Sequence, residues 1–161
     1  MDRVEQLLVF AVSDLHCALQ VSAIERVARA AEITFVPKAP ANVIGLLNVH
    51  GNIVPVLDIR RLFRLPPQEM TLDDHIIVAR TTSRAMAIIV DAVLGVTECD
   101  GQNILAPERL YPGIAYLEGI TRLQDGILFI YNLDTFLSST EKAEIEDLLT
   151  ESNPMPAGQD A

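Results

Sequence analysis

Residues 45–59 read GLLNVHGNIVPVLDI, and residues 119–133 repeat the same template as GITRLQDGILFIYNL. The two stretches align without a gap at an offset of 74 positions. In each, a glycine opens an apolar stretch, a polar turn interrupts it, and an apolar strand follows, before an Asp or Asn precedes a short apolar segment. Two apolar runs around a polar turn predict a β-hairpin, so the chain is expected to contain this hairpin twice.

A second pair of hairpins lies upstream of the first pair. Residues 8–21 form two apolar runs around a Ser13-Asp14 turn, and residues 77–90 match them around a Thr82-Ser83-Arg84 turn. Each repeat is therefore a hairpin, an irregular link and a second hairpin. This order predicts a pseudo-symmetric all-β protein made of two modules.

The length of 161 residues fits one domain of ordinary size, and half of the residues are apolar, which is ample for a packed core. We expect a single domain over residues 1–151, with module one at about 7–64 and module two at about 75–137. A helix at about 139–150 and a disordered tail at 152–161 would follow.

No apolar run approaches the ~20 residues that a membrane-spanning helix needs, so we expect no membrane insertion. The charged start, Met1 to Glu5, lacks the layout of a signal peptide, and this predicts a cytoplasmic protein. The two cysteines, Cys17 and Cys99, are too isolated for a disulfide scaffold, and Cys17 reads as a small core residue.

The formal net charge is −10, and residues 141–161 carry half of it, with six acids and one base. The main local cluster of positive charge is Arg60, Arg61 and Arg64. Three arginines make a poor footprint for a phosphate backbone, so we expect no nucleic-acid binding. The acidic end is interpreted as a solvated face that aids solubility.

Several local features carry further predictions. Ser22 followed by Glu25 has the spacing of a capping box, which predicts a turn or two of helix with Ile24, Val27 and Ala28 on one side. Asp58 is expected to cap a short helix that contains Ile59, Leu62 and Phe63.

The turn of the first repeated hairpin is expected at His50-Gly51-Asn52, because Gly and Asn accept positive φ at low cost. Pro55 cannot donate to a sheet ladder, so its strand is expected to be an edge strand or to carry a bulge. Ser138 and Glu141 form a second capping box, and Ile145, Leu148 and Leu149 in the helix that follows are expected to dock on the body.

Catalytic and metal-binding chemistry finds little support in this sequence. The three histidines, His16, His50 and His75, are each without Cys, His, Asp or Glu partners at metal-ligand spacing. No phosphate-binding glycine loop and no Gly-x-Ser-x-Gly elbow is present. We therefore predict a non-enzymatic interaction module without metal or cofactor.

Residues 45–60, from Gly45 to Arg60, resemble the signature stretch of the CheW family, the adaptors of bacterial chemotaxis. The opening residues 8–10, the segments 23–27 and 89–93 and the closing residues 128–137 also fit that family's pattern. The similarity spans about residues 5–150, and the signature stretch is fairly specific.

This resemblance implies a particular fold and role. The fold would be two five-stranded SH3-like barrels that share a hydrophobic core, with short helices. The role would be a scaffold that couples chemoreceptors to the histidine kinase CheA. The kinase contact would join barrel to barrel, because the kinase regulatory domain shares the fold, and a groove would accept the receptor's cytoplasmic helical tip. The alternatives are an adaptor of a pilus-type or other non-flagellar pathway, and a small β-barrel regulatory domain that binds a ligand.

Two positions depart from the family pattern where it touches receptors. The family's turn reads Asn-Leu-Arg-Gly, whereas this chain has Asn48-Val49-His50-Gly51, and Arg26 stands where the family usually has an acid. A co-adapted receptor, a paralogue in another system and simple drift are three open explanations. The predicted receptor-facing residues are Ile24, Arg26, Asn48, His50 and Gly51. Core packing of Ile24, turn stabilisation by Asn48 and a backbone role for Gly51 are the competing interpretations.

Overall fold

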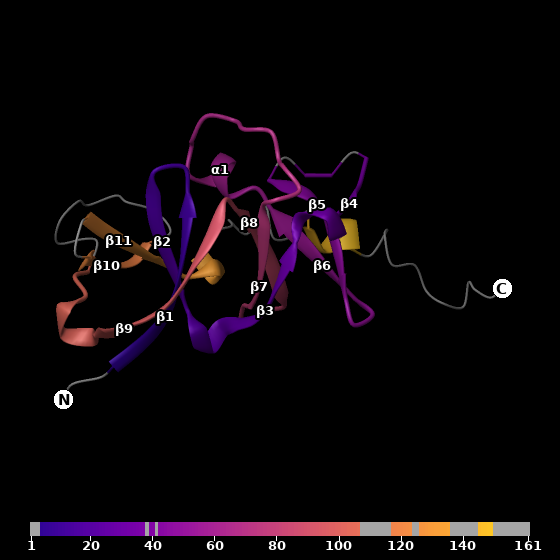
Figure 1. The fold of residues 1–161 in the computed structure, drawn as a ribbon. Coiled ribbons are helices and arrows are strands. Elements are labelled where there is room, and N and C mark those ends of the chain that lie inside the picture. Colours follow the sequence, from indigo (N-terminus) through magenta and orange to yellow (C-terminus); the bar gives the residue numbers. More distant parts are fainter. Residues whose placement is uncertain are drawn as a thin grey trace.

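A computed structural model describes residues 4–37, 39–40, 42–106, 117–123, 126–135 and 145–149. The described chain forms two β-sheets joined by short helical turns (Figure 1). The strands and helices run in this order: β1 (Val4–Val12), β2 (Leu15–Gln20), η1 (Val21–Ala23), β3 (Ile24–Arg29), η2 (Ala30–Glu32), β4 (Thr34–Phe35), β5 (Val43–Val49), β6 (Asn52–Leu57), α1 (Ile59–Leu62), β7 (His75–Arg80), β8 (Ala85–Val90), β9 (Ala92–Asp100), η3 (Gly101–Asn103), β10 (Leu117–Leu123), β11 (Gly126–Tyr131) and η4 (Leu133–Thr135).

The two sheets have closely related strand orders. Sheet A has the order β10-β11-β2-β1-β9, and sheet B has the order β3-β7-β8-β6-β5-β4. Reversing sheet B and setting β4 aside pairs each of its strands with a counterpart in sheet A. This arrangement confirms the predicted all-β, pseudo-symmetric fold, with the two-residue strand β4 as a sixth strand on one side.

The register of the hairpins reproduces the sequence repeat. Gly45 pairs with Val56, and Gly119 pairs with Ile130, which keeps the offset of 74 positions on both strands. Each of these pairs follows an irregularity at the start of the first strand. The two repeated hairpins are therefore equivalent residue for residue, including the bulge that precedes the glycine.

The sheets do not divide along the boundary between the repeats. The hairpin β1–β2 of the first repeat joins β9, β10 and β11 of the second, and the hairpin β7–β8 of the second repeat joins the strands of the first. The ranges 7–64 and 75–137 thus describe the sequence repeat, and each sheet takes strands from both ranges. The two exchanged hairpins also supply most of the largest buried cluster, which includes Phe10, Leu19, Ile77 and Ile88.

Gly45 and Gly119 both lie where another segment crosses closely. A Cβ on Gly45 would lie 2.5 Å from the backbone oxygen of Thr34 in β4. A Cβ on Gly119 would overlap the Ile104 side chain, beside the bridge between Leu105 and Ile120. A missing side chain at these two positions lets the link of each repeat lie against its second hairpin.

The predicted helix after Ser22 is wrong. Residues 21–23 form one 3-10 turn, and Ile24–Arg29 is strand β3, which pairs with β7 along its length. Ladder bonds from a strand distant in sequence outweigh the weak local preference that the Ser22 and Glu25 spacing indicated. Val27 is consequently exposed and Ala28 buried, although a helix would have placed them on one side.

The prediction that Pro55 lies on an edge strand or a bulge is also wrong. Strand β6 lies inside sheet B, between β5 and β8, and the irregularity of this hairpin lies on β5 between Val43 and Gly45. The ladder from β6 to β8 contains only Val56 and Leu57, so Pro55 stands just before that pairing begins. The hairpin turn itself is one residue shorter than predicted, because Asn52 already pairs with Val49.

Two local predictions are confirmed. The Asp58 carboxylate accepts a hydrogen bond from the Arg61 N–H at 3.3 Å and caps helix α1. Residues 145–149 are helical, and the buried side chains of Ile145, Leu148 and Leu149 pack on the main core. The capping box at Ser138 and Glu141 and the tail at 152–161 lie outside the described residues.

Candidate partner-binding groove

A groove of about 420 Å³ lies in sheet B beside the first halves of β6 and β8, which are not paired with each other. Its walls include Val54 on β6 and Ala85 on β8. The β5–β6 turn contributes Gly51, β3 contributes Glu25, and Leu149 of the helical segment 145–149 lies at its border. The groove therefore gathers parts of both repeats around the ends of four strands.

Charged side chains border this groove. Arg80 on β7 lies 3.5 Å from Glu25 on β3, and both side chains are well exposed. Arg84, in the β7–β8 turn, forms an ion pair with Glu146 of the helical segment. Such exposed pairs add little stability, so Glu25 and Arg80 can exchange their mutual contact for one with a partner.

The β5–β6 turn has the backbone of a two-residue hairpin connection. His50 and Gly51 have φ values of 52° and 88°, and both side-chain positions are exposed. The Asn48 side-chain oxygen accepts a hydrogen bond of 2.8 Å from the Gly51 N–H. Asn48 therefore stabilises the turn, and the turn presents His50 outward beside the groove.

The other two predicted residues lie away from the groove lining. Ile24 is half-buried and packs against the main core, and Arg26 contacts Glu32 at 3.4 Å. Of the five residues predicted to face a receptor, only Gly51 lines the groove directly. Sequence reasoning missed Glu25, Arg80 and Arg84. The available signal for the last two was an arginine just before the predicted Thr82-Ser83-Arg84 turn and an arginine at its end.

The alternation of side chains along β3 explains why Glu25, and not Arg26, borders the groove. The pairing of β3 with β7 shifts between Ile24 and Arg26, so Glu25 has no partner in the register. Successive side chains of a strand point to opposite sides, and Glu25 is exposed whereas Ile24 and Arg26 are half-buried. The chain thus carries its acid at the groove even though Arg26 departs from the expected pattern.

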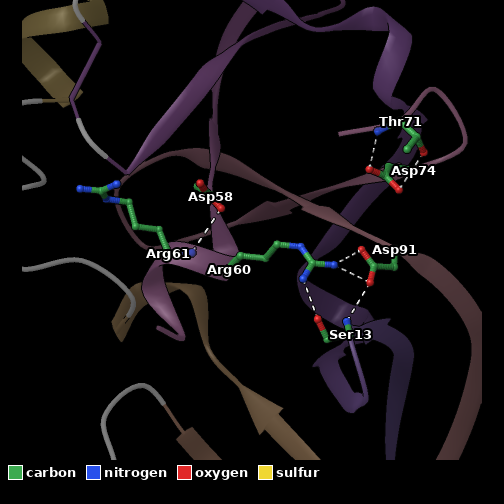
Figure 2. A network of polar contacts seen from close by, with 7 residues as sticks. All are labelled: Ser13, Asp58, Arg60, Arg61, Thr71, Asp74 and Asp91. Atoms are coloured by element: carbon green, nitrogen blue, oxygen red, sulfur yellow. Dashed lines mark hydrogen bonds and ion pairs between the residues drawn. The ribbon is translucent and has the colours of Figure 1, made fainter. Parts of the chain in front are cut away.

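A polar network near the other ends of β6 and β8 ties the two sheets together (Figure 2). Arg60 Nη2 donates to both oxygens of Asp91, at 2.5 and 2.6 Å, and Arg60 Nη1 donates to Ser13 Oγ at 2.6 Å. The Ser13 N–H donates to Asp91 at 2.7 Å. Arg60 belongs to α1, Ser13 to the β1–β2 turn, and Asp91 to the junction of β8 and β9. The network therefore fixes the place where the chain passes from sheet B to sheet A.

Two ionisable groups with perturbed pKa values lie in the core. Burial raises the pKa of the Cys17 thiol to about 12. Burial also raises the pKa of the Tyr131 hydroxyl, with a smaller effect from Cys17. Tyr131 stacks on Phe63 at a centroid distance of 4.5 Å. Both groups are packing residues whose neutral forms the core favours.

Stability is expected to fall at alkaline pH because of Cys17. Its thiol ionises near pH 9.0 when exposed and near 12 when folded, so its stabilising effect is complete below pH 9 and is lost as pH rises toward 12. Urea unfolding between pH 8 and 11 should show a shallower decline for Cys17→Ser than for the wild type. Equal slopes in the two proteins would contradict this assignment.

No group of three or more His, Cys, Asp or Glu side chains in the described part of the chain is arranged to hold a metal ion. None of the helices among those residues has the length and apolar character needed to cross a bilayer.

Comparison with known families gives a direct result. The model of the CheW-like domain matches residues 6–141, which is most of the chain. The chain belongs to the CheW-like domain family. The resemblance of residues 45–60 to the CheW signature is thereby confirmed, as is the prediction of a chemotaxis scaffold that is not an enzyme.

Individual CheW proteins resemble the chain along most of its length. The chemotaxis protein CheW of Rhizobium meliloti is 24% identical over 139 residues, covering 85% of this chain and 90% of that protein. The chemotaxis protein CheW of Bacillus subtilis is 29% identical over 137 residues, covering 83% and 86%. The crystal structure of the scaffolding protein TtCheW from Thermoanaerobacter tengcongensis matches with a TM-score of 0.76 and 25% identity, covering 86% of this chain and 96% of that one.

Proposed function

We propose that this CheW-family adaptor couples a chemoreceptor to the histidine kinase CheA, and that the groove in sheet B receives the helical tip of the receptor. The observation that carries this proposal is the convergence of the His50-Gly51 turn, Glu25 and Arg80 on one groove. A helix can lay an apolar stripe on Val54 and Ala85 while its polar flanks meet the charged border.

Three residues of the sequence-based receptor-facing set lose a direct role in this proposal. Glu25 replaces Arg26, because Arg26 is paired with Glu32 and does not line the groove. Asn48 contributes by stabilising the turn that presents His50. Ile24, the first residue of β3, contributes by packing against the main core. His50 and Gly51 retain a direct role. The groove lining then holds one acid, Glu25, and two basic residues, Arg80 and Arg84, which suits a receptor helix that carries both charges.

The proposed kinase contact uses a different surface. Strand β9 forms an edge of sheet A, and its Leu94 and Val96 are 53% and 60% exposed. Large apolar side chains on an exposed sheet edge favour contact with another barrel. The regulatory domain of CheA is the proposed occupant, in a cytoplasmic complex without nucleic acid. Separate surfaces for receptor and kinase would let one adaptor hold both at once.

Replacing His50 with glutamate is expected to weaken receptor capture and leave folding intact. The exposed His50 side chain borders a groove that already holds Glu25, so a second acid changes the local charge without disturbing the core. The loss should be about fivefold in affinity, in line with about 1 kcal/mol for a contact at an exposed rim. Titration of a matching receptor-tip fragment by isothermal calorimetry measures this change.

His16→Glu is the matched control for this experiment. His16 is also exposed and lies on β2 of sheet A, away from the groove. Both variants should keep the circular dichroism spectrum of the wild type. Unchanged tip affinity in the His50 variant, or equal losses in both variants, would count against the groove as the receptor site.

A further inference from the structure

We infer that Pro55 is the positioning residue that holds this groove open, because it prevents strand β6 from pairing with β8 along its first half. The functional consequence rests on the proposed function, since it takes the groove to be the receptor site. The inference begins from a difference between two otherwise equivalent parts of the fold.

The parallel ladders at the centres of the two sheets start at different points. In sheet A, β11 pairs with β2 at three successive positions, beginning with Leu128 and His16. The counterparts of this first pair in sheet B, at the offsets of the repeats, are Val54 and Ala85. These two residues are not paired, since the sheet B ladder begins only at Val56 and Ala87.

The unpaired positions are those that form the groove. Val54 and Ala85 both line it. Sheet A is therefore paired at the positions whose counterparts in sheet B are unpaired and line the groove. Something on β6 or β8 must account for this difference between the sheets.

Pro55 is the residue that differs in the required way. Asn52 closes the two-residue turn with Val49, so its N–H faces β5, and alternate residues from there do the same. The backbone nitrogen of Pro55 consequently faces β8. Its counterpart in sheet A is Phe129, which has an N–H and pairs with Cys17 of β2. Proline has no N–H to donate, so β6 lacks a ladder bond at the point where β11 makes one.

The missing bond leaves two strand edges that face each other across the groove without pairing. In the register of sheet A, an N–H at position 55 would face the carbonyl of Ala85, the counterpart of His16. Restoring that N–H should let the ladder extend by two positions toward the β5–β6 turn. The groove would then narrow between Val54 and Ala85, where the receptor helix is proposed to lie.

The test is Pro55→Val, which restores the N–H with a side chain of similar volume at this buried position. Pro66→Val is the matched control, since Pro66 is exposed and lies outside the strands. Backbone amide exchange by NMR should slow about tenfold at residue 55 of the Pro55 variant relative to an exposed strand amide, and at Ala85, whose counterpart His16 pairs with β11, relative to the wild type. Affinity for the receptor-tip fragment should fall about tenfold, and binding of the CheA regulatory domain should not change.

Unchanged exchange at Ala85 would overturn the inference, and slowed exchange with unchanged tip affinity would overturn its link to the receptor. If the wild type shows no chemical-shift changes in the groove on addition of the tip fragment, the proposed function is contradicted. The effect of Pro55 on strand pairing is then tested by amide exchange alone. Pro55→Ala restores the same N–H with a smaller side chain, so it gives the same two readouts should the valine variant be poorly folded.

Discussion

Replacing Phe10 with alanine is expected to lower the free energy of unfolding by about 3–5 kcal/mol, the usual cost of removing a fully buried aromatic ring. Phe10 has no exposed surface and lies on β1, in the cluster formed where the two exchanged hairpins meet. Because this cluster contains residues of both sheets, the loss should affect them together. Urea unfolding followed by far-ultraviolet circular dichroism, and separately by tyrosine fluorescence, measures the change.

The two probes should report one coincident transition for both the wild type and the Phe10 variant, as expected of a single cooperative domain. Leu94→Ala is the control, since Leu94 is 53% exposed on the edge strand β9 and should cost less than about 1 kcal/mol. A small loss at Phe10, or two separate transitions, would show that the sheets fold as independent units.

Replacing Asp91 with alanine is expected to destabilise the protein by about 3 kcal/mol, since it leaves the charge of Arg60 largely buried without its partner. The Arg60 side chain is only 12% exposed, and its Nη2 donates to both Asp91 carboxylate oxygens. The substitution also removes the acceptor of the Ser13 N–H, and Ser13 has a φ of 53°, which a non-glycine residue adopts at a cost. Urea unfolding midpoints measure this loss.

Glu25→Ala provides the comparison for Asp91, because it breaks the ion pair with Arg80, whose side chains are 37% and 65% exposed. That change should cost about 0.5 kcal/mol or less. Adding Arg60→Ala to the Asp91 variant should recover part of the lost stability, since the stranded charge is then gone. Equal losses of unfolding free energy in Asp91→Ala and Glu25→Ala would contradict the proposed role of the Arg60–Asp91 ion pair in joining the two sheets.

The sequence predicted the local architecture well because hairpins are specified locally. The repeat of residues 45–59 at 119–133 appears in the structure as one register on two hairpins. The cap at Asp58 and the docking of Leu149 were likewise readable from spacing. Each of these features depends on residues that lie within a few positions of one another.

What the sequence could not supply are the relations between hairpins. Nothing in the pattern of residues 8–21 indicates that this hairpin joins the sheet of the other repeat. The strand at 24–29 was missed because its ladder partner is distant in sequence, and the alternation that separates Glu25 from Arg26 exists only because this segment is a strand. That Pro55 has no N–H to donate was readable from the sequence, but the expected edge strand was wrong because β8 lies beside β6.

The exchange of hairpins between the repeats also sets the order in which the protein can assemble during synthesis. Strand β1 leaves the ribosome first, yet its neighbour β9 carries Asp100 opposite Val4, and β11 pairs with β2 from still further along the chain (Figure 1). Sheet A thus cannot be completed until β11, the last described strand, has emerged, whereas sheet B can be completed once β8 is made. Until then the apolar β1–β2 hairpin lacks its neighbours in sheet A. We therefore expect the nascent chain to bind a chaperone that shields exposed strand edges.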